Sequence, residues 1–209
     1  MESSERKQEI LKAASECFAR FGYEKTTLDD IGKMVGLNKA SLYYYYKSKE
    51  AIFAEVILLE AEAYLQELHG KIQDIADCRE KILTYLRERI RQMKNVLNLH
   101  NLSVEAMRQV QPLFQKLYQD VQEKEIDFIH AILQSCIEYG DMIPCDSRRI
   151  AQSILTIRDA IKLKALQGAD VRFMEMVDYK AIEDEVAFTV SLILDGLSTQ
   201  KGERECGEY

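Results

Sequence analysis

The stretch TLDDIGKMVGLNKASLYYYYKSKE, residues 27–50, predicts two short helices joined by a tight turn. Thr27 is followed three residues later by Asp30, a capping-box pattern that starts the first helix. Gly36 ends this helix because glycine adopts positive φ without a steric penalty. Asn38 is a favourable N-cap for the second helix. Two short helices with a glycine turn between them are typical of a helix-turn-helix.

The second helix, expected over Lys39 to Tyr46, has to bury one face and present the other. Helical spacing places Leu42 and Tyr46 on the buried face. A tyrosine hydroxyl binds phosphate and its ring contacts thymine methyl groups, so the opposite face suits a DNA groove. The side chains expected to reach toward DNA are Lys39, Ser41, Tyr43, Tyr44 and Tyr45. Consecutive tyrosines point all round a helix, so we expect about two of the four to make a contact.

One more helix is predicted before this pair. Apolar residues recur at helical spacing from Ile10 to Phe21, and Gly22 then supplies the residue that ends a helix at about 6–21. A small head of three short helices is therefore expected at the N-terminus.

Residues 27–50 resemble the helix-turn-helix signature of the TetR family of bacterial regulators. The family's threonine, hydrophobic-glycine-hydrophobic turn, leucine-tyrosine pair and lysine-x-lysine-glutamate are present, and the preceding helix ends in FARFGY, residues 18–23. The resemblance covers about residues 1–55 of the 209. Gly32 occupies the family's usual small position and Ala40 its frequent glycine, and neither departure threatens the fold.

Two further departures concern the tyrosine run. Tyr45 stands where the family often has histidine, which could alter base preference. Tyr46 stands at the core phenylalanine, so its hydroxyl needs a hydrogen-bond partner or water if it is buried.

The resemblance also implies which residues touch DNA. Lys39, Ala40 and Ser41 would lie nearest the base edges, and Lys49 would meet a phosphate. Tyr43 and Lys49 are the contacts that we expect first. Contacts with the backbone or the bases are implied for Thr27, Tyr43, Tyr44 and Tyr45. Thr27 caps a helix in either case, so its hydroxyl could be structural and still meet phosphate.

Composition predicts an all-α chain, because 47% of the residues are hydrophobic and only 2 are proline and 9 glycine. A long helix from Lys49 is expected to connect the head to a larger body. Further amphipathic helices are expected at about 79–98, 102–110, 113–139, 147–167 and 179–198. The predicted organisation is a helix-turn-helix DNA-binding domain at 1–47, a helical effector-binding and dimerisation domain at 48–200 and a polar tail at 201–209.

The net charge of −7 is unevenly distributed along the chain. Residues 1–55 hold nine Lys or Arg against nine Asp or Glu, so the whole excess of acid lies in residues 56–209. Residues 38–50 contain three lysines and one acidic residue. A chain that is acidic in total is therefore compatible with a DNA-binding head.

Several classes of site are not expected. The N-terminus is polar and no apolar run approaches the roughly 18 residues of a spanning helix, so we expect a cytoplasmic protein. The five cysteines are scattered and odd in number, which predicts ordinary thiols and no disulfide framework or zinc knuckle. His69, His100 and His130 lack metal-ligand spacing. No cofactor, metal or catalytic motif is expected.

Two features of the body stay open. Arg158, beside Asp159, interrupts an apolar run and suits either an acidic ligand or an intersubunit salt bridge, of which the salt bridge is favoured. Adaptable apolar side chains could line a cavity for a greasy effector or form ordinary core: Met93, Met107, Phe114, Tyr118 and Phe128.

The favoured function is a TetR-type repressor. The resemblance implies a homodimer, formed through helices at about 147–167 and 179–198, that holds operator DNA and is released by a small-molecule effector. One alternative is an architectural or adaptor protein of the same fold that binds no ligand, and another is an all-helical enzyme, for which the chain offers no motif.

Overall fold

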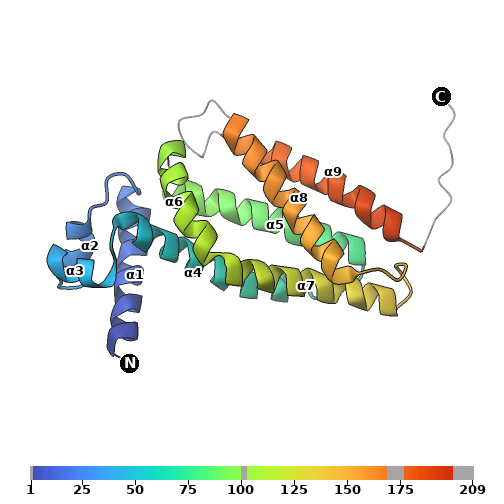
Figure 1. Cartoon of the computed structure of the whole chain (residues 1–209), viewed down its shortest axis with the longest axis horizontal. Helices are drawn as coiled ribbons and strands as arrows, with labels where there is room; N and C mark the ends of the chain where they lie inside the picture. Colours follow the sequence, from blue (N-terminus) through green and yellow to red (C-terminus); the bar gives the residue numbers. More distant parts are fainter. Residues whose placement is uncertain (1, 100–102, 169–176, 200–209) are drawn as a thin grey trace.

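The computed structural model describes residues 2–99, 103–168 and 177–199, and the expected all-α fold is confirmed within them. Residues 2–45 hold the three head helices, and the rest of the described chain forms one long connecting helix and a helical body (Figure 1). The helices are α1 (Glu2–Phe21), α2 (Leu28–Met34), α3 (Lys39–Tyr45), α4 (Lys49–Ile72), α5 (Cys78–Leu99), α6 (Val104–Leu117), α7 (Gln119–Glu138), α8 (Ser147–Gly168) and α9 (Tyr179–Leu197).

The turn between α2 and α3 has the local features that the residues predict. The Thr27 hydroxyl accepts from the Asp30 backbone N–H at 3.2 Å, and the Asp30 carboxylate accepts from the Thr27 N–H at 2.9 Å. Gly36 has φ +66°. Asn38 caps α3 by accepting from the backbone N–H of Ser41 at 2.8 Å. These hydrogen bonds satisfy backbone donors that the two helix starts leave open.

Gly32 lets the chain fold back tightly on α2. Its carbonyl accepts from the backbone N–H of Leu37 at 2.8 Å. A Cβ at position 32 would lie 2.5 Å from the carbonyl oxygen of Leu37 and 3.1 Å from the side chain of Leu42 on α3. The first of these atoms is backbone and cannot turn away. A residue without a side chain is therefore required where α3 crosses α2.

The first turns of α4 complete the core of the head. Phe53 packs edge-on against Phe18 of α1 with 5.0 Å between ring centroids, and 4.6 Å from the ring of Tyr23. Farther along, Ser15 of α1 donates to the Glu60 carboxylate at 2.9 Å. The remainder of α4 lies in the body, where Leu65, Leu68 and Ile72 are buried. One continuous helix thus links both parts (Figure 1).

The body is a set of packed helices in which α5 lies against α9, α7 against α8, and α8 against α9 (Figure 1). Its core is aliphatic along α8 and α9, as the 3.6-residue periodicity predicts. Buried members on these two helices include Ile154, Leu155, Ile182, Val186, Val190 and Leu194. No helix of the described residues is long and apolar enough to cross a membrane.

The expected boundary between the helices at 102–110 and 113–139 is wrong. Pro112 lies inside α6, which continues to Leu117, and the break falls at Tyr118. Proline lacks the backbone N–H and normally interrupts a helix. Burial of Ala106 and Val110 in α6, which packs on α4, overrides that local preference. Tyr118 is anchored instead by a hydrogen bond from its hydroxyl to Glu125 at 2.6 Å.

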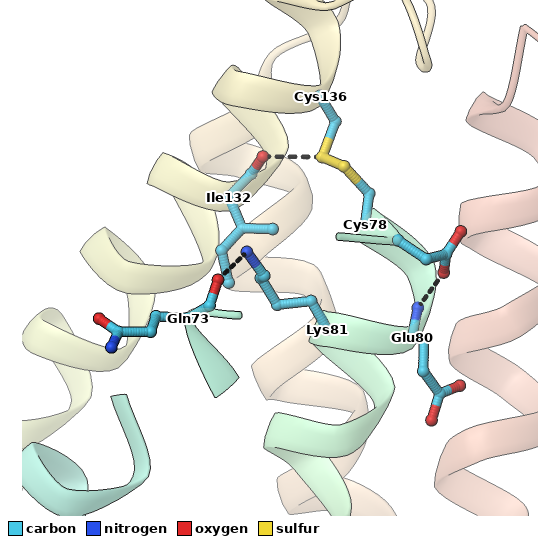
Figure 2. Close-up of a disulfide and its surroundings, with 7 residues drawn as sticks. Gln73, Cys78, Glu80, Lys81, Ile132 and Cys136 are labelled. Carbon is cyan, nitrogen blue, oxygen red and sulfur yellow. Dashed lines mark hydrogen bonds between the residues drawn. A yellow bond between two sulfur atoms is a disulfide. The ribbon is translucent and has the colours of Figure 1, made fainter. Parts of the chain in front are cut away.

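The expectation of ordinary thiols is wrong for two of the five cysteines. Cys78 at the start of α5 and Cys136 near the end of α7 form a disulfide, with 6.3 Å between their Cα atoms (Figure 2). They are 58 residues apart, so only the packing of α5 against α7 brings them together. Cys17 and Cys145 are free thiols. Cys206, His100 and the expected tail at 201–209 lie outside the described residues.

A buried carboxylate ties three helices of the body together. Glu125 of α7 is fully buried and accepts from Arg89 Nε of α5 at 2.9 Å and from Arg158 Nη1 of α8 at 2.7 Å. The Tyr85 and Tyr118 hydroxyls donate to the same carboxylate at 2.9 and 2.6 Å. Burial by itself would raise the pKa of Glu125, but the two guanidinium groups hold it well below its usual range.

The favoured interpretation of Arg158 is therefore wrong in one respect. The arginine does form a salt bridge, but its partners, Glu125 and Asp159, belong to the same chain, and its side chain is buried. An arginine enclosed in the core of one subunit is not placed to reach a second subunit.

We predict that Gly32→Ala destabilises the protein by about 1–3 kcal/mol, because the new methyl group meets a backbone oxygen that cannot move aside. Urea unfolding followed by circular dichroism measures the change. Gly70→Ala in α4 is the matched control, since a Cβ there meets nothing within 4 Å. That variant should gain about 0.5–1 kcal/mol from its better helix propensity. Equal stability of the two variants would contradict the close approach at position 32.

We predict that Glu125→Gln costs about 3–5 kcal/mol in unfolding free energy, because two buried guanidinium groups lose their counter-charge. Glu123→Gln is the control, since its partner Arg148, at 2.8 Å, is exposed, and the change should be within about 0.5 kcal/mol. The pKa of Glu125 is lowered by folding, so its contribution is fully present above the ordinary pKa of glutamate and is lost as pH falls toward the folded value. Acid unfolding of wild type and variant should converge at low pH.

Candidate nucleic-acid interface

Helix α3 presents one face to the core and one to solvent. Leu42 is fully buried, and Tyr46, the C-cap residue, is 4% exposed. The buried Tyr46 hydroxyl donates to the carboxylate of Glu55 in α4 at 2.8 Å, which provides the partner that the sequence requires for it. Burial and this hydrogen bond raise the pKa of Tyr46 well above its usual range. The core side of α3 is therefore not accessible to solvent.

The opposite side of α3 is open to solvent. Lys39 and Ala40 in the first turn are exposed, and so are Tyr43 and Tyr44 one turn later. Tyr44 is 83% exposed. Tyr45 is half-buried, with its ring edge-on to that of Tyr44 at 5.1 Å. The four tyrosines thus divide into two exposed, one intermediate and one buried side chain.

The remaining expected contact on α3, Ser41, is half-buried and its backbone N–H is used by the Asn38 cap. No carboxylate lies in α3, and Lys47, two residues after its end, is exposed. The exposed face therefore combines lysine, hydroxyl and aromatic groups without an acidic side chain of its own. Such a combination can bind phosphate oxygens and base edges.

Thr27 is exposed at the N-cap of α2, but its hydroxyl already has a partner. Its Oγ1 donates to the carboxylate of Asp30 at 2.6 Å. Hydrogen bonds from Thr27 lower the pKa of Asp30, so the carboxylate is charged at neutral pH. A phosphate at this helix start would have to share the hydroxyl with Asp30. The helix-capping role of Thr27 is seen directly, whereas its phosphate contact stays a prediction.

Lys49 has a structural role that the sequence does not reveal. Its ammonium donates to the backbone carbonyl of Tyr23 at 2.8 Å and lies 4.2 Å from the centroid of the Tyr23 ring. The lysine therefore holds the loop after α1 against the start of α4. The ammonium also lies 3.5 Å from the carbonyl oxygen of Glu24, and its expected contact with a phosphate remains a prediction.

Arg6 is a second residue that sequence reasoning misses. Its guanidinium donates to the carbonyl of Val35, the C-cap of α2, at 2.7 Å. The contact joins the first helix to the turn before α3 and spans 29 residues. No local pattern signals it. Arg6 stabilises this turn through the hydrogen bond to Val35 and does not belong to the exposed face of α3.

A model of a known protein family matches this head. The family model described as "Bacterial regulatory proteins, tetR family" matches residues 10–56, which include all of the helix-turn-helix and the start of α4. The chain belongs to the TetR family. A second model, for apoptosis inhibitory protein 5, matches residues 38–177, a range that begins inside the helix-turn-helix at the N-cap of α3. The relatives and solved structures below agree with the first model.

Two relatives show how far the similarity to TetR-type regulators extends. The HTH-type transcriptional regulator RutR of Escherichia coli K12 is 26% identical over 174 residues, which cover 81% of this chain and 82% of that one. The negative transcriptional regulator IcaR of the biofilm operon icaADBC in Staphylococcus epidermidis is 47% identical over 51 residues, 24% of this chain and 28% of that one. The similarity to IcaR is thus closer than that to RutR but covers a much shorter stretch of the chain.

Solved structures agree in fold. A transcriptional regulator from Cytophaga hutchinsonii has a TM-score of 0.73 at 25% identity, over 91% of this chain and 97% of that one. A putative transcriptional regulator from Saccharomonospora viridis, solved in complex with choline, has a TM-score of 0.57 at 20% identity, over 90% and 96%. This TetR-family chain is therefore a transcriptional regulator of the helix-turn-helix type and not an enzyme.

Proposed function

We propose that this TetR-family protein is a repressor that binds operator DNA as a homodimer and is released by a small-molecule effector. The observation that carries the DNA-binding part is the exposed face of α3, with Lys39, Tyr43 and Tyr44 directed away from the core. Repression is supported by the similarity of a 51-residue stretch to IcaR, which is named a negative regulator. Such a regulator acts on chromosomal DNA, so we propose that it works in the bacterial cytoplasm.

In this proposal α3 lies in the major groove. Lys39, Ala40 and Ser41 are nearest the base edges, because they form the first turn of the recognition helix. Tyr43, Tyr44 and Tyr45 contact the backbone or bases. Tyr43 and Tyr44 make most of these contacts in the proposal, because they are the more exposed of the three. Thr27 and Lys49 are proposed phosphate contacts at the edge of the interface, each of which also serves the fold.

The proposed dimer forms through α8 and α9. Phe188 and Leu192 lie one turn apart on α9 and are 63% and 58% exposed. Leu163 of α8 is exposed as well. Large apolar side chains gathered on one helical face are typical of a protein interface. Two copies that pair through these helices would place two copies of α3 on one side of the assembly, as a palindromic operator requires.

The proposed division of labour follows the chain. Residues 1–47 are the DNA-binding head and residues 48–200 the effector-binding and dimerisation body. The regulator from Saccharomonospora viridis was solved with choline, which supports a small-molecule effector here without identifying it. An effector needs only a different affinity for two positions of the head, and α4 is the helix that can transmit the difference.

We predict that Tyr43→Ala and Lys39→Ala each weaken binding on the order of tenfold, because each removes a contact with DNA from an exposed position. Fluorescence anisotropy with the duplex upstream of the protein's own gene measures the affinity. Tyr139→Ala is the control, since Tyr139 is 82% exposed at the far end of α7 and should leave binding unchanged.

The salt dependence of the same measurement separates phosphate contact from other binding. Affinity should fall on the order of a thousandfold between about 50 and 200 mM salt, because lysines that meet phosphates release counterions. A flat salt dependence, or equal affinity of Tyr43→Ala, Lys39→Ala and Tyr139→Ala, would refute the assignment of α3 as the DNA-binding face.

We predict that the double variant Phe188→Glu, Leu192→Glu is monomeric, because charged side chains in the proposed interface cannot be desolvated. Size-exclusion chromatography with light scattering gives the mass directly. The wild type and the control Tyr139→Glu should both have the mass of a dimer. A wild-type monomer, or a double variant that stays dimeric, would exclude α9 as the interface.

A further inference from the structure

The disulfide between Cys78 and Cys136 joins two segments that the chain keeps far apart. Cys78 is the first residue of α5, and Cys136 is in the last turn of α7 (Figure 2). Their Cα separation of 6.3 Å lies within the range that a disulfide spans. The pairing is therefore built into the packing of the body and does not depend on a local cysteine motif.

The site accommodates the open form of the bond as well as the closed form. The Cys136 sulfur lies 2.9 Å from the carbonyl oxygen of Ile132, one turn earlier in α7. A free Cys136 thiol would donate its proton to that oxygen (Figure 2). Reduction therefore leaves no buried polar group without a partner at this sulfur.

Exposure differs between the two sulfurs in a way that suits stepwise oxidation. Cys78 is half-buried, whereas Cys136 is 1% exposed. An oxidant in solution can reach Cys78 first. Cys78 also begins a helix whose end is already capped by Asp77, which accepts from the Glu80 N–H at 2.6 Å, so access to solvent singles out this sulfur. The buried Cys136 is then placed to close the bond.

The two free cysteines of the described residues, Cys17 and Cys145, form no disulfide there. Burial raises the pKa of the Cys17 thiol, whose sulfur lies 3.1 Å from Met34 Sδ. Burial likewise raises the pKa of the Cys145 thiol, with Asp146 adding to the effect. Both therefore remain protonated thiols at neutral pH. Cys145 is half-buried and provides a matched control.

The cross-link lies beside the far end of α4. Lys81 in the first turn of α5 donates its ammonium to the carbonyl of Gln73, the C-cap of α4, at 3.0 Å (Figure 2). The backbone turn after α4 is closed by a hydrogen bond from Ile75 N–H to Ile72 C=O at 3.2 Å. A change in how α5 is held against α7 thus acts on the end of the helix that carries the head.

We propose that Cys78 and Cys136 form a reversible redox-modification site, at which a peroxide closes the disulfide and lowers affinity for the operator. The regulatory part rests on the proposed function. A DNA-binding regulator works in a reducing compartment, where disulfides are usually transient and redox-sensing. The dithiol is then the resting, DNA-bound state of the repressor, and the disulfide is the released state.

The chemistry balances with hydrogen peroxide as the oxidant. The Cys78 thiolate attacks one peroxide oxygen, the O–O bond breaks, and hydroxide leaves, so that Cys78 becomes a sulfenic acid. The Cys136 thiol then attacks the Cys78 sulfur and expels the oxygen as water. In total two thiols and one hydrogen peroxide become one disulfide and two waters. Two thiols of reduced glutathione reverse the reaction by exchange and leave as oxidised glutathione.

The test uses the full-length protein, first reduced and then treated with hydrogen peroxide. Digestion without reductant should give one cross-linked peptide that holds Cys78 and Cys136 and is lighter by two hydrogens than the separate peptides. The oxidised protein should melt roughly 5–10 °C higher, because the cross-link constrains the unfolded chain. Excess reduced glutathione should return the original mass and melting temperature. A bond that never forms, or that glutathione cannot open, overturns the proposal.

DNA binding of the same samples tests the regulatory part. Oxidation should weaken binding to the upstream duplex on the order of tenfold, a size typical of coupling between two sites. Cys78→Ser and Cys136→Ala should bind like the reduced wild type and ignore peroxide, whereas Cys145→Ser should respond like the wild type. Cys78→Ser keeps the test valid if the core variant Cys136→Ala fails to fold.

The possible failures are distinguishable. Equal affinity of the reduced and oxidised wild type overturns the switch and leaves the proposed repressor intact. If neither form binds DNA, the proposed function fails and the regulatory role falls with it, while peptide mapping and melting still decide whether the redox site exists. A peroxide response that persists in Cys78→Ser assigns the effect to another cysteine and also overturns the proposal.

Discussion

Helix α4 belongs to two cores at once, and the relation between head and body depends on this single continuous helix. Its first turns supply Phe53 to the aromatic cluster with Phe18 and Tyr23, and its later turns bury Leu65 and Leu68 in the body. A helix anchored at both ends transmits a displacement as a rigid element, since its backbone hydrogen bonds resist bending. A signal received in the body can therefore reach α3 through the way α4 is held.

Two different interactions hold the body around that helix. Glu125 draws α5, α7 and α8 together, because a carboxylate removed from water has to be surrounded by donors. Charges paired in a core often add less to stability than apolar packing would, but separating these three helices would leave buried charges without their partners. The disulfide between α5 and α7 acts differently, since it depends on the redox state of the surroundings. The contacts of Glu125 do not depend on the redox state, whereas the disulfide does.

Acidic side chains are absent from α3, although the chain as a whole is acidic. The acid excess lies beyond residue 55, and α3 itself carries no carboxylate. At the edge of α3, Asp30 is occupied by the capping of α2 and Glu55 by the Tyr46 hydroxyl. These carboxylates serve helix ends and the core, so the exposed surface of α3 keeps its lysine and tyrosine groups free of acidic neighbours on the same helix.

The residues by themselves determined what depends on neighbours three or four positions away. The capping box at Thr27, the positive φ at Gly36, the cap at Asn38 and the division of α3 into two faces all follow from local hydrogen bonds and helical periodicity. The burial of Tyr46 could be predicted for the same reason. Such interactions join residues within one or two turns of each other, so a short sequence pattern is enough to predict them.

Only the tertiary structure decided what depends on contacts between distant parts of the chain. Lys49 binds the carbonyl of Tyr23, Arg158 pairs with Glu125, and Cys78 joins Cys136, across separations of 26, 33 and 58 residues. Packing also carried α6 through Pro112 against its local preference. A long polar side chain or a thiol has no preferred partner along the sequence, because its partner is chosen by which helices lie side by side after the apolar faces are buried.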